Sequence, residues 1–396
     1  MAKVLSSLRI SSLLGLAQIL SWGGSFFLLG VLADPIVRDT GWSRQWVLGA
    51  LSPGLLVSGC LAPAVGRYIG RGNGRRMLLY AGFVLGAGLI VLGVSPSLPV
   101  FLGGWCIIGV GMAMGLYDAL FAVLGKTQGA NARKSITTIT ILSGFCTTLV
   151  WPLLGAMLAA WGWRGACFGY AALLWFGIWV LYTFGLPEEE RAGSVPSSPE
   201  TKTALLPDGR LVDLLAVNFT LAAIILTAVT IQLIQVLLAK GLSLHTAIGI
   251  GTLIGPSQVG VRLLDTILPR KHPVWTTLFS CILTFFGLVL LEMGPAMASL
   301  AVIFYAVGNG MRSVLKGTLP LELFGPEHYP VVLGRLARPA LIAQAATPLA
   351  GGYLMEHFGP AGLVSTLTAL AFLNIGTTIG VRLRMRRLEP QPVAAV

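Results

Sequence analysis

The chain has 396 residues, of which only 11% are charged, and its mean hydropathy is +0.82. A soluble chain would carry about 25% charged residues, so this composition excludes an ordinary water-soluble protein. The net charge of +12 would suit a nucleic-acid partner if the basic residues were clustered on one domain, but they are distributed between apolar runs, and we expect no nucleic-acid partner.

Twelve apolar runs of about 20 residues each follow one another with almost no internal charge. A helix of about 20 apolar residues crosses the roughly 30 Å hydrocarbon layer of a bilayer. We therefore predict an all-α polytopic membrane protein with twelve transmembrane helices. In chain order the predicted helices cover residues 10–32, 45–65, 77–94, 99–124, 135–159, 165–186, 212–238, 245–264, 273–292, 296–318, 335–355 and 361–382.

One long polar segment separates the first six runs from the last six. Its proline, serine and charged residues are typical of a flexible linker. We predict an N-terminal six-helix bundle at residues 1–186, a cytoplasmic linker at 187–211, and a C-terminal six-helix bundle with a short tail at 212–396.

The basic residues predict the orientation. If the N-terminus is cytoplasmic, most of them face the cytosol, and the outer loops keep only Arg38, Arg44, Arg164 and Lys240. This asymmetry follows the positive-inside rule and places both termini in the cytoplasm.

Motifs of catalysis and metal binding are missing from the sequence. It contains no phosphate-binding loop, no Gly-x-Ser-x-Gly and no HExxH, the motifs typical of nucleotide, acyl and zinc chemistry. The five cysteines are dispersed and include no CxxC, so they are interpreted as packing residues. We expect no enzyme activity, no cofactor and no metal site.

Two short patterns recur at a six-helix offset. The first is Gly-x-Gly-Met at 109–112 and 308–311. The second is Pro-Leu-x-Gly followed by a further glycine, at 152–155 with Gly162 and at 348–351 with Gly359. Such echoes indicate parallel repeats about an axis along the membrane normal, and hence two pseudo-symmetric bundles.

The loop between the second and third predicted helices reads GRYIGRGNGRR, with Gly66, Arg71, Gly74, Arg75 and Arg76 as its signature residues. With the twelve runs and the central linker, it resembles the major facilitator superfamily of secondary transporters, in particular its monocarboxylate-porter-like bacterial members. The chain departs from the family signature at Gly70, where an aspartate is usual, and its second glycine is displaced by one position. The loop after the eighth helix keeps an acid, Asp265. The resemblance therefore implies that the charge pairs closing the inner side are weighted to the second half.

Two other family motifs are absent or degenerate. Proton-coupled members often carry an arginine at the position of Trp105, and the antiporter motif is reduced to the segment 151–156. The resemblance therefore implies neither coupling through that arginine nor antiport.

Few ionisable residues lie within the apolar runs, and inside a bilayer such residues are candidates for function. Asp118 is the one acid well inside a run, and the cations include Arg262, Arg312 and Lys316. Asn309, Arg312 and Lys316 share one face of a helix because their spacings are three and four.

We predict an ion pair between the halves, from Asp118 to Arg312 or Lys316, as an inner gate. The resemblance implies this, since the inner ends of the fourth and tenth helices approach each other in the family when the cytoplasmic side closes. The alternative is that Asp118 is a static partner within its own half.

Arg262 and Asp265 are three residues apart and can pair on one helix face. The resemblance implies that Arg262 binds an anionic substrate. The alternative, which we favour, makes both residues part of the inner-gate charge network.

Uncharged polar residues are predicted to line a central cavity. They occur on the first, fifth, seventh and eighth helices: Gln18, Trp22, Ser25, Thr140, Ser143, Thr147, Asn218, Gln232, Gln235 and Gln258. Each one separately can also be interpreted as a helix–helix hydrogen bond.

These features together predict a secondary active transporter, symporter or antiporter, in the bacterial inner (plasma) membrane. We expect it to work as a monomer by alternating access, with a small organic anion as substrate and the proton as coupling ion. The alternatives are an efflux pump for hydrophobic or cationic compounds, with Asp118 as counter-charge, and a non-transporting membrane sensor or scaffold.

Overall fold

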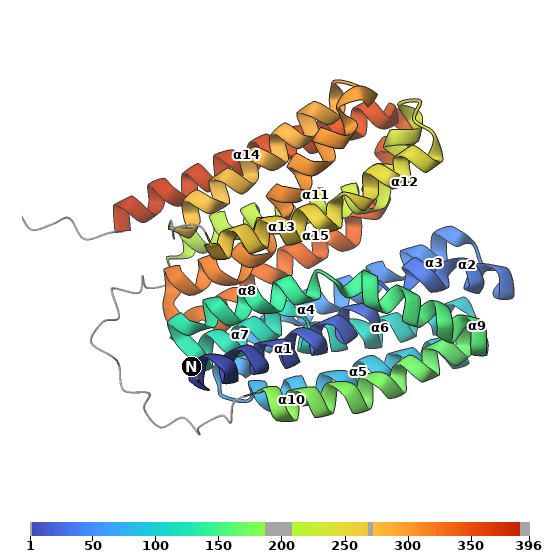
Figure 1. Ribbon diagram of the computed structural model, residues 1–396, viewed down its shortest axis with the longest axis horizontal. Coiled ribbons are helices and arrows are strands. Elements are labelled where there is room, and N and C mark those ends of the chain that lie inside the picture. Colours follow the sequence, from blue (N-terminus) through green and yellow to red (C-terminus); the bar gives the residue numbers. More distant parts are fainter. Residues whose placement is uncertain (1, 187–207, 268–271, 389–396) are drawn as a thin grey trace, which may run out of the picture. The chain divides into compact units, whose positions relative to one another are not determined.

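The computed structural model describes residues 2–186, 208–267 and 272–388, and these ranges contain helices and no strand (Figure 1). The predicted linker, apart from its last residues, lies outside the described residues. The chain divides into two compact units. Unit 1 comprises Met1–Ser197 with Pro326–Pro348, and unit 2 comprises Ser198–Gly325 with Leu349–Val396.

Unit 1 is built from ten α-helices of the first half and one segment of the second half. In chain order these helices and their connecting 3₁₀ and π turns are α1 (Ala2–Gly23), α2 (Leu29–Thr40), α3 (Arg44–Gly49), α4 (Leu51–Gly70), α5 (Gly74–Val94), α6 (Leu98–Gly115), α7 (Tyr117–Gln128), η1 (Gly129–Asn131), α8 (Ala132–Ser143), α9 (Cys146–Leu173), η2 (Leu174–Ile178) and α10 (Trp179–Gly185).

Unit 2 contains α11 (Gly209–Ala239), α12 (Leu244–Thr252), α13 (Ile254–Ile267), α14 (Pro273–Glu292), η3 (Pro295–Met297) and most of α15 (Ala298–Leu388). The long α15 is not one rod. Gly325 and Gly359 interrupt it with positive φ angles of 68° and 66°. These angles are unfavourable for residues with a Cβ atom.

All twelve predicted apolar runs are mostly helical, and five of them are interrupted by short turns or a bend, at residues 24–28, 50, 116, 144–145 and 253. In the described part of the chain, eight helical stretches are long and apolar enough to cross a membrane, and the longest, Pro295–Leu388, contains three predicted runs. The prediction of an all-helical membrane protein is therefore confirmed, whereas the number of crossings stays a prediction.

Segment 326–348 belongs to unit 1 because it packs closely on α4. A Cβ atom at Gly66 would clash with the carbonyl oxygen of Pro330 and would lie 3.3 Å from Cα of Gly334. The sequence division at the linker places this segment with the second half. The contacts place it with the first, although the predicted domain boundaries themselves stay a prediction.

The turns of the two units repeat each other. Gly162 and Gly359, matched in the sequence, both have positive φ angles, of 68° and 66°. A second repeat was not recognised in the sequence: Gly41 and Gly241 begin the same Gly-x-Ser-x₅-Gly pattern, and their φ angles are 69° and 86°. Equal backbone geometry at equal positions supports the parallel internal repeat.

The glycines of the Gly-x-Gly-Met echo all lie at helix–helix contacts. Their neighbours are Gly54 of α4 for Gly109, Leu85 of α5 for Gly111, Thr284 of α14 for Gly308, and Gln258 of α13 for Gly310. Each pair thus contacts the second and third helices of its half, but in opposite order. The matched glycines therefore lie on corresponding helices, but the glycine that faces the second helix is the first of the pair in one half and the second of the pair in the other.

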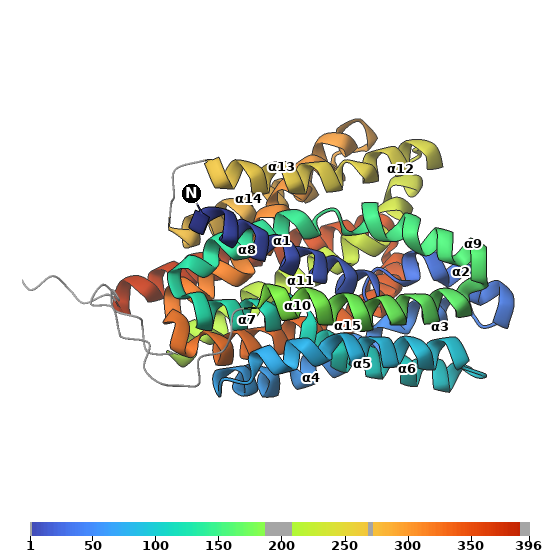
Figure 2. The same ribbon diagram turned by 60° about the horizontal axis from the view of Figure 1, so that its bottom comes forward.

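Unit 1 depends on close packing of α4, α5 and α6, which lie side by side (Figure 2). At the crossing of α4 and α6, an added Cβ at Gly109 would clash with the backbone oxygen of Gly54 and lie 2.8 Å from its Cα. Small residues let helices approach this closely in a membrane, where packing drives association.

In unit 2 an ion pair joins the start of α11 to the end of α15. Arg384 donates from Nε to Asp208 Oδ2 at 2.8 Å and from Nη2 to Oδ1 at 3.3 Å. The hydrogen bond from Arg384 lowers the pKa of Asp208 below its ordinary value of 3.8, because it stabilises the charged carboxylate.

We predict that Gly109→Ala destabilises the protein by about 1–3 kcal/mol, the usual effect of overpacking. Gly103→Ala on the same helix is the control, since nothing lies within 4 Å of a Cβ there. Thermal unfolding of the detergent-purified variants measures the difference. Equal melting temperatures would show that α4 and α6 are not in the contact described.

We predict that the Asp208–Arg384 pair makes the stability of the fold depend on pH in the acid range. A carboxyl group with a lowered pKa stabilises the fold above its unfolded pKa, and this contribution disappears as the pH falls through the folded value. The difference in melting temperature between the natural protein and Asp208→Asn should therefore be constant from pH 5 to pH 8 and shrink below about pH 4. A difference that grows on acidification would contradict the pairing.

Candidate functional site

The fourth predicted helix is interrupted. The run 99–124 is continuous in the sequence, but α6 ends at Gly115 and α7 begins at Tyr117, with Leu116 extended at φ −79° and ψ −175°. The carbonyl of Gly115 accepts a hydrogen bond from Gln18 Nε2 at 2.7 Å. Tyr182, whose hydroxyl also accepts from Gln18 at 3.1 Å, lies 3.4 Å from the same carbonyl. Helices that are interrupted, with the freed backbone carbonyls accepting hydrogen bonds from side chains, are a feature of transporter binding sites.

Gln18 and Trp22 have polar atoms available at this interruption. Gln18 is fully buried, and its Oε1 has no hydrogen-bond partner among the described residues; the same holds for Trp22 Nε1. The Trp22 ring lies 5.1 Å from that of Tyr117. Ser25 differs, because it lies in the turn after α1 and its hydroxyl donates to Ser21 O of α1 at 2.6 Å. The predicted face thus contains two polar groups that could hydrogen-bond a ligand, on Gln18 and Trp22, and one hydroxyl, on Ser25, that already donates to the backbone.

Asp118 lies in the first turn of α7, where the positive end of the helix dipole favours a carboxylate. It interacts electrostatically with the hydroxyl of Tyr329, a fully buried residue of segment 326–348 in the same unit. Tyr329 was not identified from the sequence. Its position after the Gly-Pro at 325–326 marks the start of a helix, but nothing in the sequence indicates that this start approaches Asp118.

Arg312 is bound within unit 2. Its side chain is buried, with 8% exposed, and Nη2 donates to the backbone oxygen of Asn218 at 3.0 Å and to its Oδ1 at 2.5 Å. Nη1 donates to Cys281 Sγ at 3.1 Å, and the Asn374 amide oxygen accepts in either orientation of that side chain. The guanidinium therefore joins α11, α14 and both unit 2 stretches of α15 through neutral partners.

Arg262 and Asp265 do not form the predicted pair within the described residues. Arg262, 6% exposed, donates from Nε to the Gly310 carbonyl at 3.2 Å and from Nη2 to Gln258 Oε1 at 3.4 Å. The helices α13 and α15 approach closely at this point, since a Cβ atom at Gly310 would lie 2.8 Å from Cα of Gln258.

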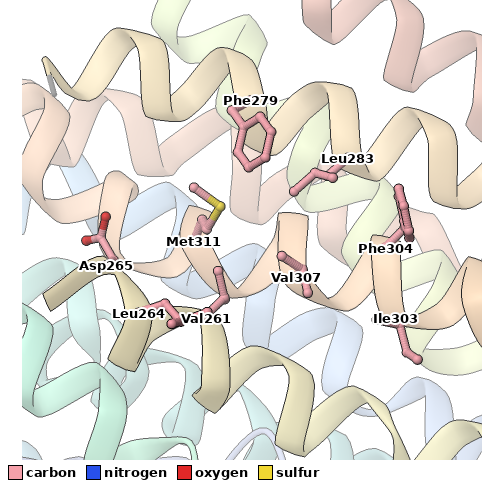
Figure 3. Close-up of a pocket in the computed structure, with 9 residues that line it drawn as sticks. All are labelled: Val261, Leu264, Asp265, Phe279, Leu283, Ile303, Phe304, Val307 and Met311. Atoms are coloured by element: carbon pink, nitrogen blue, oxygen red, sulfur yellow. The ribbon is translucent and has the colours of Figure 1, made fainter. Parts of the chain in front are cut away.

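Asp265 lies instead at one end of a pocket of about 310 Å³ in unit 2 (Figure 3). The pocket is apolar apart from this carboxylate. It is lined from α13, α14 and α15 by Val261, Leu264, Asp265, Phe279, Leu283, Ile303, Phe304, Val307 and Met311.

The remaining predicted cavity residues fall into two groups. Thr140 and Ser143 donate to backbone oxygens of their own helix, those of Thr137 and Ile139. Gln232 is buried against Gly351, and its Oε1 has no hydrogen-bond partner in the described ranges. Thr147 and Asn309 are half-buried, Gln235 is exposed, and Lys316 is half-buried one turn beyond Arg312.

The signature loop connects α4 to α5. Arg71 caps α4, Gly72 has the positive φ angle of 88°, and α5 starts at Gly74. Arg75 Nη2 donates to Thr183 O at 3.5 Å, and Arg76 is exposed. The carbonyls of Ile69 and Gly70 accept hydrogen bonds from Lys126 Nζ at 3.2 and 2.7 Å, so a lysine of α7 caps the end of α4.

Metal binding has no support in the described residues, where no group of three or more His, Cys, Asp or Glu side chains converges.

Comparison with known proteins identifies one family. A family model described as Major Facilitator Superfamily matches residues 14–336, and no curated protein matches the chain.

Several solved structures have the same fold. The human organic anion transporter MFSD10 (TETRAN) is 16% identical, with a TM-score of 0.75 over 94% of this chain and 99% of its own. The transporter FucP in its outward conformation is 13% identical, with a TM-score of 0.74 over 96% and 99%. The proton:xylose symporter XylE, bound to 6-bromo-6-deoxy-D-glucose, is 14% identical, with a TM-score of 0.69 over 94% and 95%.

We predict that Asn218→Leu destabilises the protein by about 1.5–3 kcal/mol, because it removes hydrogen bonds to a buried charge. Gln235→Leu on the same helix is the control, since Gln235 is exposed. The double variant Asn218→Leu/Arg312→Met should lose less than the sum of the single variants, because no buried charge remains. Unfolding of the purified variants in detergent measures all four. An additive double variant would contradict the role given to Asn218.

Proposed function

The chain belongs to the Major Facilitator Superfamily, and on that premise we propose that it carries a small organic anion across the membrane by alternating access, driven by the proton gradient. It is a multi-pass membrane protein and a secondary transporter, not an enzyme. The substrate class, the coupling ion and the residues below are the proposal.

The observation that carries the proposal is Arg262. A cation held inside a bilayer is costly, and it is retained where function uses it. Arg262 is nearly fully buried beside Gln258, and a guanidinium next to an amide suits two-point binding of a carboxylate. The assignment favoured from the sequence, which makes Arg262 and Asp265 part of the inner-gate charge network, stays a prediction, and the Arg262 guanidinium also bonds the Gly310 carbonyl.

Arg312 is not the anion ligand in this proposal. Its guanidinium is held by Asn218 and Cys281 within unit 2, so its role is to hold the helices around it in register. The name of MFSD10 as an organic anion transporter agrees with an anionic substrate, although the similarity to it concerns the fold alone.

The inner gate is proposed to pair Asp118 with Lys316. Of the two cations considered for Asp118, Arg312 is bonded to Asn218 of its own unit through Nη2, and Lys316 is half-buried one turn further along α15. Protonation of Asp118 would weaken this pair and allow the gate to open, which couples opening to the proton.

The second candidate is efflux of hydrophobic or cationic compounds. The observation that favours it is the aromatic group beside Asp118: the Trp22 and Tyr117 rings are 5.1 Å apart, and Tyr117 stacks on Phe121 at 5.0 Å. Aromatic faces and a carboxylate suit an organic cation.

The remaining proposals concern placement. The distribution of basic residues supports cytoplasmic N- and C-termini and an inner (plasma) membrane location. We also propose that a single chain is the functional unit.

The test is thermal stability of the purified protein in detergent against carboxylates, phosphates, amines and lipophilic cations at pH 6 and pH 8. A ligand at 100 times its dissociation constant adds about 2.7 kcal/mol to the apparent stability. We expect carboxylates to stabilise the natural protein, Arg262→Gln to lose this effect, and the control Arg335→Gln, an exposed arginine, to keep it.

Two outcomes would reject the anion proposal. If lipophilic cations alone stabilise the protein and Asp118→Asn abolishes that effect, the efflux candidate is correct. If carboxylates stabilise Arg262→Gln as well as the natural protein, the anion binds elsewhere.

A further inference from the structure

Two basic segments meet at one end of unit 1. The turn between α4 and α5 and the end of α7 lie at the same end of the unit as the start of α1 (Figures 1 and 2). Lys126 Nζ joins them through its hydrogen bonds to Ile69 O and Gly70 O. A Cβ atom at Gly72 would lie 3.8 Å from the same ammonium group. The two segments therefore form one continuous surface.

The charge of this surface has a single sign. Residues 66–76 and 126–134 contain seven basic residues and no acid. We define the basic end as its four exposed members: Arg67, Arg71, Arg76 and Lys134. None of these four forms an ion pair with another described residue. Grouped like charges repel one another, so an external anion would stabilise this end of the unit.

The chemistry and position of the basic end suit phosphate groups held at a membrane surface. The exposed arginine guanidinium groups can bind phosphate oxygens in a bidentate manner, and basic residues next to membrane helices attract anionic lipids. All four residues lie at or next to the ends of the helices α4, α5 and α8. We propose that the basic end of unit 1 binds the phosphate headgroups of anionic phospholipids. This proposal is independent of the transported substrate.

Gly70 allows the proposal to be tested by adding a charge as well as by removing one. It lies between Arg67 and Arg71 at the end of α4, and its φ angle is not positive. A Cβ atom there would meet only Val331 Cγ2, at 3.6 Å, which is an ordinary contact. An aspartate at this position therefore fits sterically and would supply an internal counter-charge to the basic end.

The experiment measures binding of dioctanoyl phosphatidylglycerol and of dioctanoyl phosphatidylcholine to the full-length protein in detergent, by the shift in melting temperature with lipid concentration. We expect phosphatidylglycerol to bind more tightly and its affinity to fall with salt. Each removed charge near the surface should weaken binding about fivefold. Arg71→Gln/Arg76→Gln should therefore weaken it about 25-fold.

A second experiment adds a negative charge to the basic end instead of removing positive ones. Gly70→Asp should weaken phosphatidylglycerol binding, whereas Gly70→Asn, of the same size, should leave it unchanged. Arg38→Gln, an exposed arginine outside both basic segments, is the control for loss of charge elsewhere. Melting temperatures without lipid establish that each variant is folded.

Three results would overturn the proposal. One is equal binding of phosphatidylglycerol and phosphatidylcholine. Another is an equal loss of binding in Arg38→Gln and Arg71→Gln/Arg76→Gln. The third is an equal stabilisation by inorganic phosphate at the same concentration, which would assign the basic end to a soluble anion instead of a lipid.

Discussion

The bilayer offers no hydrogen bonds to a protein backbone, so every interruption of a membrane helix must be satisfied by the protein itself. This constraint explains which side chains hold unit 1 together. The carbonyl of Gly115, released where α6 ends, accepts from Gln18, which connects α1 to that interruption. At the end of α4 the carbonyls of Ile69 and Gly70 also accept from Lys126, which connects α7 to α4. The interruption and this helix end are thus both points of attachment between helices distant in the sequence.

The same constraint applies to buried charge and separates the two arginines of unit 2. Arg312 is surrounded by amide, carbonyl and thiol groups from three other helical stretches, which it thereby connects to its own. Arg262 donates to Gln258 of its own helix and to the Gly310 carbonyl of α15. These bonds connect α13 to α15.

The sequence predicted the helices well because the length and apolarity of a run are local properties. It also located the matching turns at Gly162 and Gly359, where glycine is needed for a positive φ angle. It did not predict the interruption at Leu116, since no proline lies there and the run is apolar apart from Asp118. That interruption depends on Gln18 and Tyr182, which come from other helices. The helix-face argument assigns Arg312 to one side of its helix but cannot say which residues contact it, because a helix face is a local property and the neighbouring helix is set by the tertiary structure.

The two units repeat the same turns but differ in the chemistry they bury. In the described residues, unit 1 places an acid, Asp118, beside the aromatic residues Trp22 and Tyr117 at an interrupted helix, whereas unit 2 buries Arg262 and Arg312. A shared fold does not specify a substrate, and the part of the structure that follows the repeat carries no information about it. The departures from the repeat do carry such information. The repeat therefore fixes the turns and the helix packing of each unit, whereas the half-buried acid of unit 1 and the buried cations of unit 2 are specific to each unit.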